Sequence, residues 1–201
     1  MITCAKCSNH ACNRKALDQA PIGCPSLNVD TQLSEEIYQD EQNLLIAEAA
    51  AMIVSQGYGE KTRVEEIIEF AKRCNYQSIG LAFCIGLAKE AKIFEKVLVH
   101  HGFHTETIIC KNGALPRDMI GVHNSSVPMC NPIGQAQYLN DMKTDLNVML
   151  GLCIGHDSLF IKYSQAPVTV LAVKDRVLAH NPLGAIYMAD SYYKERLFPE
   201  L

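Results

Sequence analysis

Nine cysteines occur in this 201-residue chain, and four of them fall within its first 24 residues. They are separated by two, four and eleven residues in a polar segment rich in small side chains, and they are Cys4, Cys7, Cys12 and Cys24. Two thiolates spaced two residues apart can face one ion from a tight turn, and a second pair farther along completes a tetrahedron. The spacing therefore predicts a metal site near the N-terminus.

Two kinds of metal centre fit such a ligand set. Zinc fits, because four thiolates form one of its usual structural sites, and the spacing alone does not separate it from a cluster. An iron–sulfur cluster is the alternative, since Cys24 is followed by Pro25 and a Cys-Pro pair often ends cluster motifs. His10 lies between the cysteines and could replace one of them as a ligand. Scattered free thiols are the simpler explanation against which both are weighed.

Four further cysteines point to a second site. Three of them end short apolar runs typical of buried strands, and the fourth precedes an Asn-Pro pair that predicts a helix N-cap and first turn; they are Cys84, Cys110, Cys153 and Cys130. The carboxyl ends of parallel strands line one edge of a sheet, where ligands bind. We therefore expect these thiols to converge in one crevice and to bind a cofactor there, as a metal, iron–sulfur or redox site. Ordinary core cysteines are the alternative.

Acid–base side chains follow the same strand ends. His156 and Asp157 come shortly after Cys153, and Lys174 follows the last predicted strand. An imidazole beside a carboxylate can move protons near neutral pH. His156, Asp157 and Lys174 are therefore the predicted catalytic residues of the crevice, with a surface ion pair as the simpler explanation for the Lys-Asp-Arg run that begins at Lys174.

Strand and helix patterns alternate through most of the chain. Apolar runs predict four strands, at 78–84, 103–110, 146–153 and 167–173, with a helix over 86–102 between the first two. Two helices are expected before them, at 34–56 and at 62–74, the second opening with a Thr-x-x-Glu capping box. Continuous apolar strands with helical crossovers predict a three-layer, Rossmann-like α/β domain with a mainly parallel sheet. We expect this domain over 31–201, after a cysteine-rich metal-binding segment at 1–30.

Composition restricts the class of protein. The chain is 48% hydrophobic and 20% charged, with a formal net charge of −4 and a pI near 6.0, so it offers no basic stripe for nucleic acid. It has no apolar run of membrane-spanning length and no signal peptide, so we expect a cytoplasmic protein with no membrane partner, whose thiols stay reduced. The stretch "CIGLAKEA" has one glycine where a dinucleotide fingerprint needs three, and no nucleophile elbow is present.

Several motifs together carry a family resemblance. The N-terminal cysteines, "TRVEEIIEFAKRC", "IGLAFCIGLAKEA", "MCNPIGQAQYLN", "GLCIGHDSLF" and "APVTVLAVKDRVLAHNP" cover nearly the whole chain. They resemble a family of uncharacterised proteins, mostly from anaerobic bacteria and archaea, usually labelled predicted metal-binding proteins. The resemblance implies zinc bound by the four N-terminal cysteines and implies no particular activity.

Two hypotheses of different class follow. The first is a metal- or iron–sulfur-dependent redox enzyme that works at the cysteine-rich crevice on an unknown small molecule or redox partner. The second is a non-enzymatic metal or small-ligand binding or sensor protein with a purely structural zinc. Either form could assemble as a homo-oligomer through the alanine-rich helix expected at 34–56.

Overall fold

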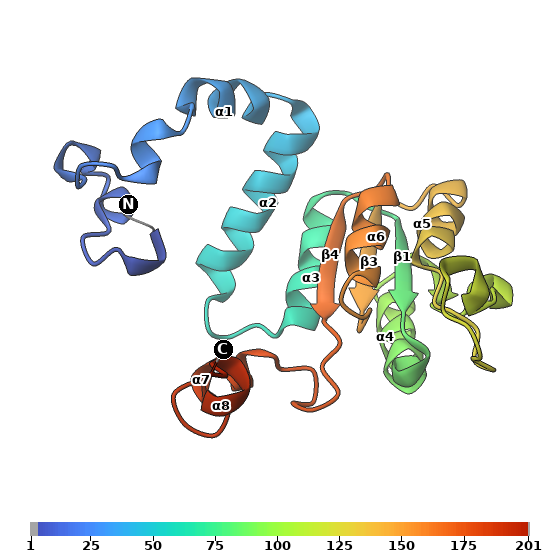
Figure 1. Ribbon diagram of the computed structural model, residues 1–201. Coiled ribbons are helices and arrows are strands. Elements are labelled where there is room, and N and C mark those ends of the chain that lie inside the picture. Colours follow the sequence, from blue (N-terminus) through green and yellow to red (C-terminus); the bar gives the residue numbers. More distant parts are fainter. Residues whose placement is uncertain (1–3, 201) are drawn as a thin grey trace. The chain divides into compact units, whose positions relative to one another are not determined.

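A computed structural model describes residues 4–200 and divides the chain into two compact units, Met1–Ala51 and Met52–Leu201 (Figure 1). The division falls inside helix α2, Glu41–Gly57, which begins in the first unit and ends in the second. The expected separate role of residues 1–30 stays a prediction.

The first unit contains short turns followed by helices. Four 3-10 turns cover the cysteine-rich segment, at Cys4–Lys6, Ala11–Arg14, Leu17–Gln19 and Pro25–Asn28. Helix α1, Thr31–Tyr38, is capped by Asp30, whose carboxylate accepts the Leu33 N–H at 2.9 Å.

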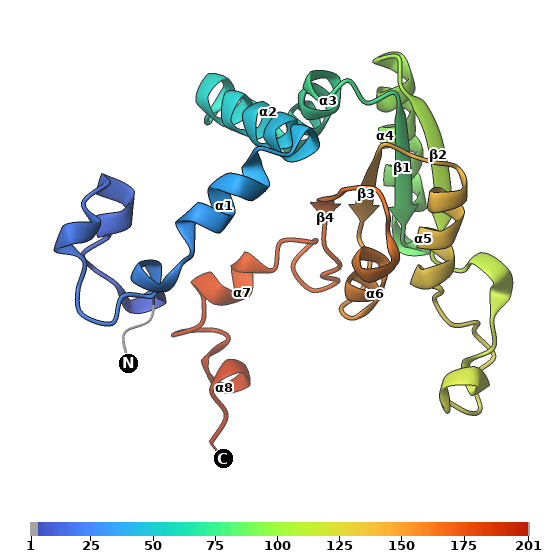
Figure 2. The ribbon, with the colours of Figure 1, turned by 90° about the horizontal axis from the view of Figure 1, so that it is seen from above.

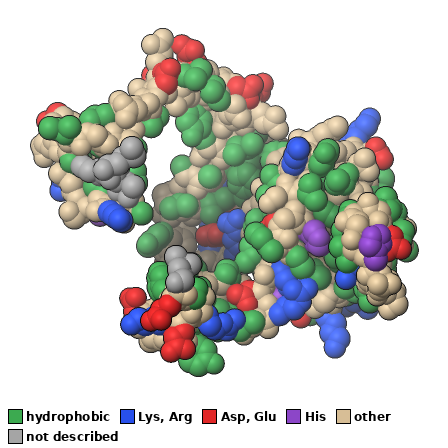
Figure 3. Space-filling view, in the orientation of Figure 1, with side chains coloured by type: hydrophobic (Ala, Val, Ile, Leu, Met, Phe, Trp, Pro, Cys, Tyr) green, Lys and Arg blue, Asp and Glu red, His purple; other side chains and the backbone are tan. Residues whose placement is uncertain are grey.

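The prediction of one helix over 34–56 was wrong, because the chain breaks between α1 and α2. The carboxylate of Asp40 accepts the N–H groups of Gln42 and Asn43 at 3.1 and 3.0 Å, which is how an N-cap residue starts a new helix. Hydrophobic side chains lie at the surface along α2 (Figure 3), among them Leu44 and Val54.

The second unit is built on a four-stranded parallel sheet in the order β2-β1-β3-β4 (Figure 2). Its strands are β1 Ser78–Phe83, β2 His104–Ile109, β3 Leu146–Leu150 and β4 Val168–Ala172. The predicted α/β class with a parallel sheet is confirmed. Central strand β3 is buried along its whole length, including the polar Asn147 in its otherwise apolar run.

The observed strands are shorter than the predicted ones. Cys84 and Cys110 follow directly after β1 and β2, as expected for residues at strand ends. Cys153 lies three residues beyond β3, because Gly151 has φ of +66° and turns the chain out of the extended conformation.

Helices cover both faces of the sheet (Figure 2). Helices α3, Arg63–Arg73, and α4, Ala88–His100, share one hydrophobic cluster with Ile79 and Leu81 of β1. Helices α5, Pro132–Asp141, and α6, His156–Tyr163, share another with Ala82. Side chains alternate between the two faces along a strand, so Cys84, two residues after Ala82, lies on the α5/α6 face as Ala82 does.

Helix α3 begins as the sequence predicted. The Thr62 hydroxyl accepts the Glu65 N–H, and the Glu65 carboxylate accepts the Thr62 N–H at 2.7 Å, so both halves of the capping box are present. Lys61 and Arg73 both form ion pairs with Glu69, which lies in the middle of α3. Cys74 ends the helix as a buried thiol whose pKa is raised by burial, which matches the expectation of a neutral cysteine.

After β4 the chain forms a loop and two short helices, α7 Leu183–Tyr187 and α8 Lys194–Leu197. Within residues 4–200, no helix has both the length and the apolar character that crossing a bilayer requires.

The capping box provides a test of the α3 boundary. Thr62→Ala should lower the free energy of unfolding of the second unit by about 1 kcal/mol, because one N-terminal N–H of the helix loses its acceptor. Urea unfolding followed by circular dichroism measures the change. Ser55→Ala in α2 is the control, since its exposed hydroxyl bonds only to Met52 O within its own helix and its loss should not destabilise the protein. An unchanged midpoint for Thr62→Ala would contradict the capping role.

Candidate thiol site at the carboxyl edge of the sheet

The sheet has one topological switch point, between β1 and β3. The chain leaves β1 for α4 on one face and leaves β3 for α6 on the other, so the loops after these two strands diverge around a crevice. At the base of these loops the two turns are in close contact, because a Cβ added at Gly151 would lie 2.2 Å from Leu87 Cδ1. Open α/β sheets bind ligands at such a point.

Strand register brings Cys84 and Cys110 together. Phe83 pairs with Ile109, and the Cys110 N–H donates to Phe83 O at 2.9 Å, so the two cysteines occupy the next paired level of neighbouring strands. Both belong to the hydrophobic cluster on the α5/α6 face, and their side chains are hydrogen-bonded to each other. Gln135 of α5 holds this end of the two strands, because its Nε2 donates to Phe83 O and to Ile108 O.

The turn after β1 directs backbone donors at both sulfurs. The Ile85 N–H donates to Cys110 Sγ at 3.4 Å, and the Gly86 N–H donates to Cys84 Sγ. Lys174 also hydrogen-bonds to the Cys84 thiol. Burial alone would raise the pKa of Cys84, but the Gly86 N–H, the Lys174 charge and the Cys110 thiol together outweigh it, so the pKa lies below its usual value.

Cys110 has the opposite character. Burial, with Cys130 and Cys84 adding to it, raises the pKa of Cys110 to about 12 in spite of the Ile85 N–H. The thiol is only 3% exposed. Cys84 is therefore the more readily ionised thiol of the pair, and Cys110 keeps its proton at neutral pH.

Cys130 reaches the pair from the start of α5, as predicted. Asn131 caps this helix by accepting the Gly134 N–H at 2.9 Å, and its own N–H donates to Cys110 O at 2.8 Å. The Asn112 side chain bonds to Asn131 and to Ile109 O, which fixes the segment against the end of β2. In this position the Cys130 thiol is hydrogen-bonded to Cys110.

Cys153 lies at the rim rather than in the pair. It is half-buried, and Arg176 donates to its sulfur at 3.5 Å. The charge of Arg176 also interacts with Cys84 and Cys130, so the guanidinium lies within electrostatic reach of three thiols. The structure thus brings all four predicted crevice cysteines to one edge of the sheet.

The three predicted catalytic residues have different surroundings. Lys174 contacts the Cys84 thiol and is part of the site. His156 is the first residue of α6, where burial and then the nearby charge of Lys111 lower its pKa against the opposing effect of Asp157, so it is neutral at pH 7. Asp157 accepts the Ser158 N–H at 2.7 Å and acts on the imidazole only through its charge.

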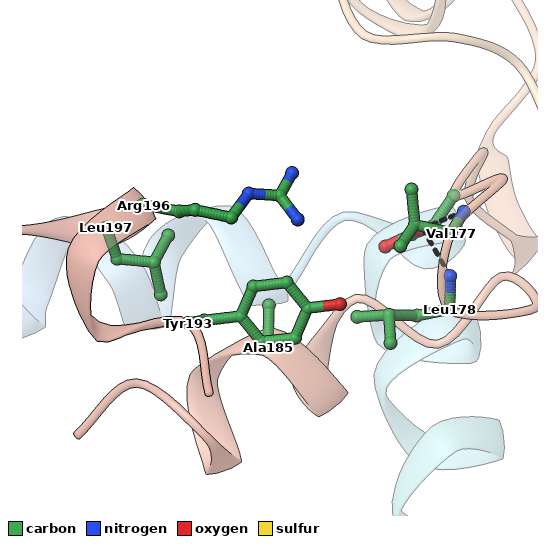
Figure 4. Close-up of a pocket in the computed structure, with 7 residues that line it drawn as sticks. Val177, Leu178, Ala185, Tyr193, Arg196 and Leu197 are labelled. Atoms are coloured by element: carbon green, nitrogen blue, oxygen red, sulfur yellow. Dashed lines mark hydrogen bonds between the residues drawn. The ribbon is translucent and has the colours of Figure 1, made fainter. Parts of the chain in front are cut away.

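A folded loop positions Lys174 and Arg176. The carboxylate of Asp175, between them, accepts the N–H groups of Val177 and Leu178 at 2.9 and 2.8 Å (Figure 4). The same loop borders a hollow of about 220 Å³ in which the Tyr193 ring lies beside it (Figure 4). The start of the loop is held at the carboxyl edge by the Lys174 N–H, which donates to Leu152 O at 3.2 Å.

The four N-terminal cysteines are not gathered in the same way. Cys4 and Cys12 are exposed, Cys7 is half-buried and accepts the His10 N–H at 3.5 Å, and Cys24 is buried. Over residues 4–200, no three His, Cys, Asp or Glu side chains form a group arranged to hold a metal ion, and this applies to both cysteine groups. Metal binding by either group stays a prediction.

Sequence reasoning missed several contributors to the site. They are Gly86, Gly151, Lys111 and Gln135. Lys111 had a usable signal, because it directly follows a strand-ending cysteine. The others act through backbone donors or through loops distant in sequence, for which local patterns give no signal.

Comparison with known proteins places the chain in a family. Residues 24–171, from the last N-terminal cysteine to β4, match the family described as "Protein of unknown function (DUF1847)". The chain belongs to the DUF1847 family. The DUF1847 match contains all four crevice cysteines and His156.

A curated relative supports this membership. "Uncharacterized protein MJ0455" of Methanocaldococcus jannaschii is 48% identical over 196 residues, which cover 96% of this DUF1847 chain and 97% of the relative. No solved structure matches the chain. The expected membership of a family of unknown function is confirmed, and these comparisons do not extend to metal binding.

The Lys174 contact predicts how Cys84 reacts. In Lys174→Gln, the midpoint of the pH profile for alkylation by iodoacetamide should move upward, because the thiolate loses a neighbouring cation. A rise of one pKa unit leaves roughly one tenth of the thiolate below the midpoint. Peptide mass spectrometry of timed samples gives the rate at Cys84, which keeps 6% of its surface exposed beside the exposed Gly86.

Two controls accompany this experiment. Lys96→Gln, on the exposed side of α4, makes the same change in charge and should leave the profile unchanged. Cys74, with 4% exposure and a raised pKa, reports the rate at a buried thiol that lacks the cation. If Lys174→Gln kept the wild-type midpoint, Lys174 would not stabilise the thiolate.

Proposed function

We propose that this protein is a thiol–disulfide redox protein that works at the crevice, with a structural zinc bound by its N-terminal cysteines. The observation that supports the redox role is the contact between a thiolate-stabilising environment at Cys84 and a buried, protonated thiol at Cys110. Redox-active pairs need this asymmetry, because the thiolate attacks and the thiol waits to resolve the product.

The positions of the two cysteines also allow a disulfide. Paired residues on neighbouring strands have Cα atoms roughly 5 Å apart, which falls within the range of about 4.4–6.8 Å that a disulfide spans. Both side chains project to the same face, and their sulfurs are already hydrogen-bonded. Oxidation of the pair therefore needs little movement of the backbone.

The reaction that follows is a two-electron exchange. The Cys84 thiolate attacks a substrate disulfide, forms a mixed disulfide and releases one substrate thiolate. Cys110 then loses its proton and attacks Cys84 Sγ, which releases the second substrate thiolate and leaves a Cys84–Cys110 disulfide. The substrate gains two electrons and two protons, and a cellular dithiol returns the protein to its reduced form.

The remaining residues of the crevice support these steps. Lys174 and the Gly86 N–H stabilise Cys84 as the attacking and later the leaving thiolate. Neutral His156 would accept the proton that Cys110 loses and pass it to a released thiolate. Asp157 would stabilise the imidazolium that forms in between. Cys130, hydrogen-bonded to Cys110, offers a second resolving thiol.

The structural zinc is supported by the ligand types and their spacing. Cys4, Cys7, Cys12 and Cys24 are the four thiols of the first unit, and the His10 N–H donates to Cys7 Sγ at 3.5 Å. The described part of this unit buries few side chains, and a bound metal would supply the folding energy that its small core lacks.

Trapping the mixed disulfide tests the redox role. When the reduced Cys110→Ser/Cys130→Ser double variant reacts with 2-hydroxyethyl disulfide, it should accumulate the adduct on Cys84, because both resolving thiols are absent; intact-mass analysis detects the adduct. The wild type should instead form the Cys84–Cys110 disulfide, and Cys84→Ser should form neither product at this site. Cys74→Ser is the matched control and should behave as wild type. A wild type that never forms the disulfide would exclude the mechanism.

Elemental analysis and an absorption spectrum of anaerobically purified protein test the metal. We expect about one zinc per chain, which should be lost in Cys7→Ser and kept in Cys84→Ser. Iron with sulfide, lost when Cys153 or Cys84 is replaced, would instead make the crevice an iron–sulfur site. Zinc in the first unit together with inert crevice thiols would favour the binding or sensor protein.

A further inference from the structure

Three cations surround the crevice thiols. Lys111 follows β2, and Lys174 and Arg176 follow β4. Lys174 contacts Cys84, Arg176 donates to Cys153 at 3.5 Å, and the charge of Lys111 acts on His156. Within the described chain, the ion pairs with carboxylates involve none of these three cations.

The nearest carboxylates are committed to the backbone. Asp175 accepts the N–H groups of Val177 and Leu178, and Asp157 accepts that of Ser158. These bonds anchor the turns on which the site is built. Lys174 and Arg176 are therefore neighboured by thiols, and the Lys111 ammonium donates to Pro128 O at 2.6 Å.

Bare backbone leaves space beside one of these cations. A Cβ built at Gly86 would lie 3.6 Å from Lys174 Nζ and 3.9 Å from Cys84 Sγ, which is ordinary van der Waals contact with both. Gly86 is exposed, so the ammonium can be approached across the turn after β1 without meeting a side chain. Arg176, also exposed, stands at the rim beside Cys153.

We infer that the substrate is a small disulfide carrying an anionic group, a carboxylate, sulfonate or phosphate, a few bonds from its sulfur. This inference rests on the proposed redox function and names the substrate class of the same site. Arg176 holds the anionic group at the rim, Lys111 adds to the attraction, and Lys174 stays with the Cys84 thiolate. The attack then proceeds as above: the bond from Cys84 Sγ to one substrate sulfur forms as the substrate S–S bond breaks, and the leaving sulfur departs as a thiolate.

A series of three disulfides with the same reacting bond tests the inference. They are 3,3′-dithiodipropionate, 2-hydroxyethyl disulfide and cystamine, which are anionic, neutral and cationic. The rate at which each modifies Cys84 in the reduced wild type is divided by its rate with a small free thiol, which removes the intrinsic reactivity of the reagent. We expect the anionic disulfide to exceed the neutral one by on the order of tenfold and the cationic one to be slowest, with the differences shrinking as salt is added.

Variants show which cation is responsible. Arg176→Gln should remove most of the anionic preference, measured as the ratio of the anionic to the neutral rate so that any general change in the reactivity of Cys84 cancels. Lys162→Gln, in the last turn of α6, makes the same change in charge on an exposed residue away from the thiols and should keep the preference. Equal relative rates for the three disulfides, or a preference unaffected by Arg176→Gln, would overturn the inference and leave the redox function standing. Rates at Cys84 no faster than at Cys74 with all three would instead overturn the redox function itself.

Discussion

The site depends on one competition, between the burial of the Cys84 sulfur and the donors that surround it. Taking a thiolate out of water disfavours its charge, and most buried cysteines therefore stay neutral, as Cys74 and Cys110 do. At Cys84 the turn after β1 supplies a backbone N–H and the loop after β4 supplies an ammonium group, and their combined effect exceeds that of burial. Two cysteines at the same level of adjacent strands thus have pKa values shifted in opposite directions.

The parallel sheet makes this competition possible. Parallel strands end at one edge of the sheet, and at the switch point between β1 and β3 the following helices go to opposite faces. The N–H groups of the turns at this point can therefore donate to side chains. Glycine is needed at the crossing of the two turns, since a side chain at Gly151 would collide with Leu87. The turns after β1 and β3 therefore have to pack closely against each other at the same place where they surround the thiols.

Much of this arrangement could be predicted from the sequence. Apolar runs located all four strands, the Thr-x-x-Glu box located α3, and the Asn-Pro pair after Cys130 located the start of α5. Convergence of the crevice cysteines followed from strand ends in a parallel sheet. The contact of Lys174 with Cys84 could not be predicted, because it depends on strand order, which places β3 and β4 on the same side of β1. The break between α1 and α2 was missed although Asp40 is a good N-cap residue, because the apolar pattern continues across it.

The two cysteine groups differ in what their surroundings favour. A metal site needs several ligands deprotonated at once, and the metal's own charge makes this favourable. In the crevice, Lys174 lowers the pKa of Cys84 and the charge of Arg176 also acts on this thiol, whereas Cys110 is buried where a proton is strongly retained. One thiol of the pair therefore ionises far more readily than the other, and a metal would need both deprotonated. The N-terminal cysteines lie in short polar turns with little core around them, and there a metal would add the stability that packing does not provide.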